Sequence, residues 1–144
     1  MYLLWEVYLE NKILLNKIEL SIKWTDLDPY NHLNNSKYFD FMTEARAKLF
    51  WEYTLNSKTQ LIIHQCNIIF KKPYYYPNNI IIEQYIEKID GASFDLKYIF
   101  KSPNNYDLIH AESLVKMVTF DPDKNRACRI PKEIMNILEK KNEV

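Results

Sequence analysis

Apolar and polar residues alternate along several stretches of the chain, and this pattern predicts strands. Residues 17–24 alternate strictly, which is the period of a strand with one buried face. Its apolar positions are Ile18, Leu20, Ile22 and Trp24. Residues 93–100 alternate in the same way, with Phe94, Leu96, Tyr98 and Phe100 on the apolar face. A long strand is also expected over 108–120, with Ile109, Ala111, Ser113, Val115 and Met117 on its core side.

Two further apolar runs complete the predicted sheet. Residues 61–70 form an almost continuous apolar run, which is typical of a largely buried strand. Residues 80–89 predict another strand, and Asp90-Gly91 connects it to the strand at 93–100. An Asp-Gly pair between two such runs is a strong signal for a tight hairpin. Gly91 is also the single glycine of the chain.

One long helix is expected between the first strand and the others. From about residue 35 to 53, apolar residues recur at helical spacing at Tyr38, Phe41, Met42, Ala45 and Leu49. Further apolar residues fall on other sides of this helix, at Phe39, Phe50 and Trp51. We therefore expect the helix to be covered on several sides. Residues 131–141 predict a short C-terminal helix with Pro131 in its first turn.

Together these elements predict an α+β fold, in which a curved antiparallel sheet of five or six strands surrounds one long central helix. The length of 144 residues fits one domain over residues 1–144. The chain carries 19 basic and 19 acidic residues, and the basic ones are scattered. This charge distribution argues against nucleic acid as a partner.

The chain ends and the cysteines suggest a cytoplasmic protein. Residues 1–12 are apolar, but they lack a basic start and contain Glu6 and Glu10, so we expect neither a signal peptide nor a membrane span. Cys66 and Cys128 have no metal-ligand spacing and no secretory context. Reduced thiols are therefore expected, and these are typical of the cytoplasm.

Small polar residues gather where the first strand ends and the long helix begins. They are Asp26, Asp28, Asn31, Asn34, Asn35 and Ser36, with Pro29 fixing a bend. Asn31 is suited to a left-handed backbone conformation, and the residues at 34–36 are suited to capping the helix. A helix N-terminus also concentrates free N–H donors that polarise a carbonyl oxygen. With a carboxylate beside it, such an end has both halves of an acyl-transfer site.

The segment "DLDPYNHLNNSKYFDFMTEAR" resembles the signature of the hot-dog-fold thioesterases of the 4-hydroxybenzoyl-CoA thioesterase and acyl-CoA thioesterase group. That signature reads D-x-D-x-x-G-H-V-N-N-x-x-Y, followed by E-x-A-R. The resemblance extends to the order of elements and to "NRACRIP", and covers roughly residues 15–140. It implies hydrolysis of an acyl-CoA to the acid and CoA, with no metal and no cofactor besides the CoA of the substrate. It also implies a homodimer or homotetramer with sites at the subunit interface.

The resemblance assigns catalytic roles to four residues. Asp28 matches the nucleophile or general base, and Asn35 matches the position whose backbone N–H polarises the thioester carbonyl. Glu44 falls where another branch of the superfamily has a catalytic glutamate, although it could instead be a structural partner of Arg46. His32 matches the family histidine. Plant acyl-carrier-protein thioesterases have an asparagine two residues after the aspartate, where this chain has Tyr30, and this departure favours a local hydrogen-bonding role for His32.

Other residues are candidates for binding the substrate. Tyr30, Asn31 and Ser36 belong to the same segment, and Ser93 matches a family serine or threonine near the cleft or is a plain hairpin serine. The phosphates of CoA attract cations. Candidate cations are Lys71, Lys72, Arg126 and Arg129, each of which could also be ordinary surface charge. His64 and His110 are expected to have structural or surface roles.

Three alternative functions stay open from the sequence. The acyl group could be attached to an acyl-carrier protein in place of CoA. A hot-dog dehydratase or hydratase would need a histidine and a carboxylate, such as His32 and Glu44, to converge on the substrate. A non-catalytic subunit that binds acyl thioesters would not need Asp28.

Overall fold

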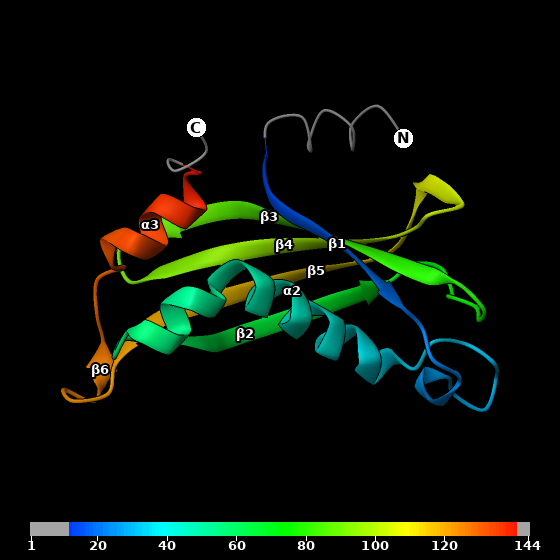
Figure 1. Cartoon of the computed structure of the whole chain (residues 1–144), viewed down its shortest axis with the longest axis horizontal. Helices are drawn as coiled ribbons and strands as arrows, with labels where there is room; N and C mark the ends of the chain where they lie inside the picture. The colour runs from blue at the N-terminus through cyan, green and yellow to red at the C-terminus, as the bar shows by residue number, and fades with distance from the viewer. Residues whose placement is uncertain (1–11, 141–144) are drawn as a thin grey trace.

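The structure is a computed structural model that describes residues 12–140, and it contains one six-stranded sheet with a long helix against one face (Figure 1). The segments at 1–11, where we expected no signal peptide, and at 141–144 lie outside the described residues. The strands are β1 (Ile13–Ser21), β2 (Gln60–Phe70), β3 (Asn79–Asp90), β4 (Ser93–Ser102), β5 (Asn105–Asp121) and β6 (Arg126–Ala127). The helices are η1 (Trp24–Asp26), α2 (Asn35–Asn56) and α3 (Lys132–Leu138).

Every strand pair is antiparallel, and the order across the sheet is β1-β3-β4-β5-β2. The short β6 pairs with the end of β5. The predicted hairpin joins β3 to β4, and Gly91 adopts a φ of +45°, which favours glycine. The sheet curves around α2 in Figure 1, so the predicted hot-dog fold is confirmed.

The core lies between α2 and the inner face of the sheet. The helix buries Tyr38, Phe41, Met42, Ala45 and Phe50. The apolar face predicted for β4 is confirmed, because each of its four residues is at most 1% exposed. On β5, Ala111, Ser113, Val115 and Met117 are at most 3% exposed, whereas Ile109, also predicted on this face, is only partly buried. Removal of these apolar side chains from water is the main stabilising contribution of the fold.

The prediction that residues 61–70 form a largely buried strand is wrong. Among the described residues, β2 lies at the edge of the sheet and pairs only with β5. Most of its side chains are exposed, including Ile62, Ile63 and Ile69. An apolar run shows that a segment avoids water, but it does not show whether a neighbour covers both faces.

Two further expectations about burial are also wrong. β1 ends at Ser21 and Trp24 begins η1, so Trp24 is 70% exposed instead of lying on the apolar face of the strand. Nor is α2 covered on several sides within residues 12–140. Phe50 is buried, but Phe39 and Trp51 are 43% and 59% exposed.

Candidate functional site

Asp28 organises the loop that leads from η1 to α2. Its Oδ1 accepts hydrogen bonds from the backbone N–H groups of Tyr30, at 2.9 Å, and His32, at 3.0 Å. The N–H of Asp28 donates to the carbonyl of His32 at 2.8 Å. Asn31 has a φ of 63°, so its predicted left-handed conformation is confirmed. Among the described residues no group donates to Oδ2 of Asp28, and that oxygen is available for chemistry.

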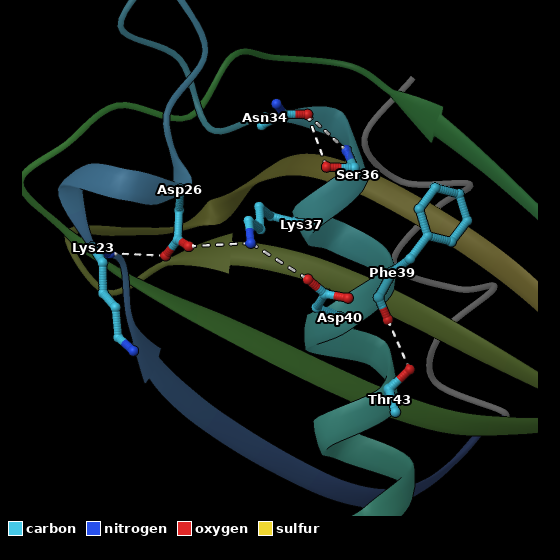
Figure 2. A network of polar contacts seen from close by, with 8 residues as sticks. All are labelled: Lys23, Asp26, Asn34, Ser36, Lys37, Phe39, Asp40 and Thr43. Carbon is cyan, nitrogen blue, oxygen red and sulfur yellow. Dashed lines mark hydrogen bonds and ion pairs between the residues drawn. The ribbon is translucent and has the colours of Figure 1, made fainter.

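The N-terminus of α2 follows directly and is capped by Asn34. Oδ1 of Asn34 accepts a hydrogen bond from the N–H of Ser36 at 3.0 Å, as Figure 2 shows. The predicted capping is thereby confirmed for Asn34. Asn35 is the first helical residue, and within residues 12–140 its N–H has no hydrogen-bond acceptor. A free donor at the positive end of a helix suits a developing oxyanion.

A second aspartate fastens this loop to the helix (Figure 2). Asp26 is only 8% exposed, and its Oδ2 accepts a hydrogen bond from the N–H of Lys23 at 2.9 Å. Its Oδ1 lies 3.8 Å from Nζ of Lys37, in the first turn of α2. The carbonyl of Asp26 accepts the N–H of Asn34 at 2.8 Å. Asp26 therefore positions the helix end, whereas Asp28 faces the site.

The loop between β2 and β3 forms the opposite wall. The N–H of Leu33 donates to the carbonyl of Tyr74 at 2.7 Å, and the His32 ring meets Tyr75 edge-on with centroids 4.9 Å apart. Among the described residues neither ring nitrogen of His32 has a hydrogen-bond partner. The expected local hydrogen bond of His32 thus involves its backbone, and its ring contributes packing.

His110 of β5 holds the loop between β2 and β3 in place through hydrogen bonds to its backbone. Its carbonyl accepts the N–H groups of Lys71 and Lys72, at 2.8 and 3.0 Å, and its Nδ1 lies 3.1 Å from the carbonyl of Pro73. Because a carbonyl only accepts, Nδ1 carries the hydrogen. Burial lowers the pKa of His110 below its ordinary value of 6.5, because the charged form loses its hydration. This structural role agrees with the expectation from the sequence.

The two loops and the start of α2 enclose a cavity of about 240 Å³. Its lining residues are Asp28, His32, Leu33, Asn35, Tyr38, Phe70, Lys71, Lys72, Pro73 and Tyr74. A carboxylate, a helix N-terminal donor and two lysines therefore meet in one place. This set can attack or hydrate a carbonyl, stabilise the resulting oxyanion and bind an anionic substrate.

Glu44 does not share this cavity in the single chain. It lies on the exposed side of α2 and lines a separate hollow of about 700 Å³ with residues of α2 and Ile137 of α3. That larger hollow also contains the carboxylate of Glu52, but its lining includes no residue from a helix N-terminus, so we place the candidate site at Asp28. Glu44 is not paired with Arg46, which instead contacts Thr43 and Tyr98.

Three predicted substrate-binding residues lie at the far end of the sheet. Ser93 begins β4, and Arg126 and Arg129 belong to β6 and the segment after it. Thr119 of β5 lies at this far end, because its N–H donates to the carbonyl of Ala92, the residue before Ser93. His110, earlier on β5, lies at the end beside the cavity. Thr119 is nine positions after His110, and this separation spans roughly 30 Å along the strand. Tyr30, Asn31 and Ser36 lie next to the cavity but do not line it.

Sequence reasoning missed most of the apolar lining. Tyr38, Phe70 and Tyr74 line the cavity, and the ring of Tyr38 contacts Phe70 and Phe100 edge-on. Tyr38 and Phe70 had been assigned to a helix core and a strand, and nothing in a local pattern shows that the two meet. For the tyrosine run at 74–76, the sequence allows either the lining of an acyl or adenine pocket or, as the favoured interpretation, aromatic packing against the sheet, and Tyr74 does line the cavity.

Comparison with known proteins places this site in a family. A model of the thioesterase-like superfamily matches residues 22–138, and the chain belongs to that superfamily. It is thus a hot-dog-fold member of a class of thioester hydrolases. The match covers the candidate site and every strand except β1.

Individual relatives support the same assignment. The long-chain acyl-CoA thioesterase FadM of Escherichia coli is 22% identical over 130 residues, which cover 84% of this chain and 95% of FadM. The PA2801 protein of Pseudomonas aeruginosa is 24% identical with a TM-score of 0.79, covering 85% of this chain and 97% of that one. Slr0204 of Synechocystis, a 1,4-dihydroxy-2-naphthoyl-CoA thioesterase, has a TM-score of 0.79 at 11% identity, covering 89% and 98%. None of the helices in the described part of the chain has the length and apolar composition of a membrane span.

Proposed function

We propose that the protein is an acyl-CoA thioesterase that hydrolyses its substrate to the free acid and CoA. The observation that carries this proposal is the meeting of Asp28 and the unpaired N–H of Asn35 in one cavity at the start of α2. Lys71 and Lys72 line the same cavity and supply positive charge for the phosphates of CoA. The name of FadM supports a CoA thioester over one carried by a protein.

The chemistry has two routes that use the same atoms. In the first, Oδ2 of Asp28 attacks the thioester carbonyl, CoA leaves as the thiolate, and water hydrolyses the resulting mixed anhydride. In the second, Oδ2 takes a proton from water, and the hydroxide attacks the carbonyl before the C–S bond breaks. In both routes the Asn35 N–H stabilises the oxyanion. Oδ1 stays bonded to the loop and keeps the carboxylate in place.

The dehydratase alternative has less support. It needs a histidine and a carboxylate directed at the same two carbons of the substrate. In the single chain, His32 lines the small cavity and Glu44 lines the other hollow.

We also propose that the protein is a homodimer or homotetramer in solution. β2 presents an unpaired edge with exposed Ile62, Ile63 and Ile69. On α2, Phe39, Trp51 and Leu55 are exposed as well. A second copy that covers these residues would pair the edge strand and remove a surface that otherwise favours aggregation. Light scattering at micromolar concentration should show at least a dimer, and an active monomer would contradict this.

The test of the proposed activity is a parallel assay on three kinds of substrate. Release of free CoA is measured on a panel of aliphatic and aromatic acyl-CoAs, the same acyl groups are offered on an acyl-carrier protein, and hydration of enoyl-CoAs is followed alongside. We expect CoA release that Asp28→Asn abolishes. Hydration without hydrolysis would establish the dehydratase instead, and binding without any turnover would establish the non-catalytic subunit. A cytoplasmic location and a route without metal stay predictions.

A further inference from the structure

A row of polar side chains crosses the inner face of the sheet beneath the middle of α2. The strand register places Asn16 of β1 opposite Gln84 of β3, Gln84 opposite Tyr98 of β4, and Tyr98 opposite Ser113 of β5. Residues directly opposite each other on one face are in side-chain contact range. The residues before and after Gln84 on this face are Ile82 and Ile86, both in the core. A polar row in this position is unusual, because inner faces are normally apolar throughout.

Several polar atoms in this row are buried and have no partner. Gln84 is fully buried, and neither its Oε1 nor its Nε2 has a hydrogen-bond partner among the described residues. Asn16 donates through Nδ2 to the carbonyl of Ala45 on α2 at 3.1 Å, but its Oδ1 is unpaired. An unpaired buried amide is strongly unfavourable, and native proteins pair such groups with protein or with an ordered molecule.

The far end of the row has one weak hydrogen bond. The Tyr98 hydroxyl, also fully buried, lies 3.4 Å from Nη1 of Arg46, near the limit of a hydrogen bond. Nη2 of Arg46 donates to Thr43, and Ser113 donates to the carbonyl of Asn67 at 2.5 Å. Ser113 therefore already has a hydrogen-bond partner, and the polar atoms that lack one lie between Asn16 and Tyr98.

The chemistry of these atoms defines what would bind. The Gln84 amide offers two N–H donors on Nε2 and an acceptor at Oε1, and the unpaired Asn16 oxygen is a second acceptor, so a partner must both donate and accept. A carboxylate could not donate to the two amide oxygens, and an ammonium could not accept from Nε2. A neutral hydroxyl oxygen both donates and accepts. A water has two hydrogens and can donate to both amide oxygens while accepting from Nε2, whereas an alcohol can donate to one of the two oxygens and accept from Nε2.

The row also has a defined position relative to the candidate site. Tyr38 lines the cavity and contacts Phe100, and Tyr98 is the next inner-face residue on β4, about 7 Å further along the strand. Along α2, Ala45 is ten residues beyond Asn35, or about 15 Å. An acyl chain with its carbonyl at Asn35 would bring its distal end to this row if it followed α2 past the Tyr38 ring.

We propose that Asn16, Gln84 and Tyr98 form a buried site for a neutral hydroxyl oxygen, which is either an ordered water or the distal hydroxyl of a hydroxylated acyl chain. Binding of a distal acyl hydroxyl rests on the proposed thioesterase function, because that function places the acyl carbonyl at Asn35. Binding of an ordered water does not rest on it. The site would favour acyl groups with a distal hydroxyl over plain acyl groups of the same length.

The first arm of the test is structural and does not depend on activity. A crystal structure of the wild-type protein at a resolution that shows waters should contain an oxygen within hydrogen-bond distance of the Gln84 amide. A second crystal, grown with a non-hydrolysable ω-hydroxyacyl-CoA analogue, identifies the source, since the ligand hydroxyl either replaces that water or leaves it in place. A Gln84 amide without any oxygen partner in both crystals would overturn the proposal.

The second arm compares hydrolysis of acyl-CoAs with that of their ω-hydroxy counterparts over a series of chain lengths. If the hydroxyl binds here, the ratio of kcat/KM for the two should favour the hydroxylated substrate at one length. Gln84→Leu should then lower that ratio by about fivefold, the value of one neutral hydrogen bond. Ile86→Leu, on the same strand and face, is the matched control and should leave the ratio unchanged.

The outcomes separate this inference from the proposed function. If wild type and Gln84→Leu hydrolyse acyl-CoAs with the same kcat/KM ratio for hydroxylated over plain substrates, a water in the crystal assigns the site to water alone. If the crystal shows no water there, the same result refutes the proposed site. No hydrolysis of any acyl-CoA contradicts the proposed function, while the crystal still decides whether the Gln84 amide binds an oxygen. Tyr98→Phe is a second variant in case Gln84→Leu fails to fold, and it should lower the ratio in the same direction.

Discussion

Asp28 has two separable roles, and substitutions can distinguish them. Oδ1 holds the loop through the N–H groups of Tyr30 and His32, while Oδ2 is the oxygen available for chemistry. Asn keeps an acceptor at Oδ1 but can neither attack a carbonyl nor take a proton from water. Ala removes both functions. Comparing Asp28→Asn with Asp28→Ala therefore measures catalysis and loop stability independently.

The expected magnitudes follow from these contacts. Asp28→Asn should lower kcat by at least ~10²-fold, the low end for loss of a positioned acid or base. Its free energy of unfolding should change by less than about 1 kcal/mol, since both loop hydrogen bonds remain. Asp28→Ala loses two hydrogen bonds near the surface, which costs about 1–2 kcal/mol in total. For a domain of this size that cost lowers Tm by roughly 3–6 °C.

The assays are CoA release under saturating substrate and thermal unfolding of the same preparations. Glu44→Gln is the matched control, because it neutralises a carboxylate of α2 that lies outside the cavity. It should keep most of the activity. If Asp28→Asn retains near wild-type turnover while folded Glu44→Gln is inactive, the helix glutamate is the catalytic group. Equal Tm values for the Asn and Ala variants would refute the loop role of Oδ1.

Three further predictions test the surroundings of the site. Asn35→Pro should lose activity, because it removes the backbone N–H although proline is compatible with the first helical position. Asn35→Ala keeps the N–H and should retain most of the activity. Equal loss for both variants in kinetic assays would implicate the Asn35 side chain. Asp26→Asn should destabilise by about 1–2 kcal/mol in denaturant unfolding. Asp40 is the other carboxylate beside Lys37, and its side chain is 69% exposed, so Asp40→Asn should lower the free energy of unfolding by no more than about 0.5 kcal/mol. Equal losses for the two variants would contradict a special role for Asp26. Burial lowers the pKa of His110 in the folded protein, so as the pH falls the unfolded chain binds a proton at this histidine before the folded protein does. The free energy of unfolding should therefore fall as the pH drops below 6.5. His110→Gln should show a shallower decline in that range, and identical slopes would show that another group is responsible.

The sequence by itself determined the elements and the local half of the site. Period-2 alternation located β4 and the second half of β1, and helical spacing located α2, because both patterns depend on neighbours in the chain. Asp28 and Asn35 are seven residues apart, and a single turn and helix cap bring them together. Local chemistry was therefore enough to place a carboxylate beside a helix N-terminus.

Tertiary structure decided what surrounds that pair. Phe70, Lys72 and Tyr74 reach the cavity only because β2 runs along β5 and His110 holds the following loop. The edge position of β2 and the exposure of Trp24 also depend on strand order and on where pairing stops. The polar row through Gln84 is visible only once the register of four strands is known. A local pattern records whether a residue avoids water, but long-range pairing decides which residues meet.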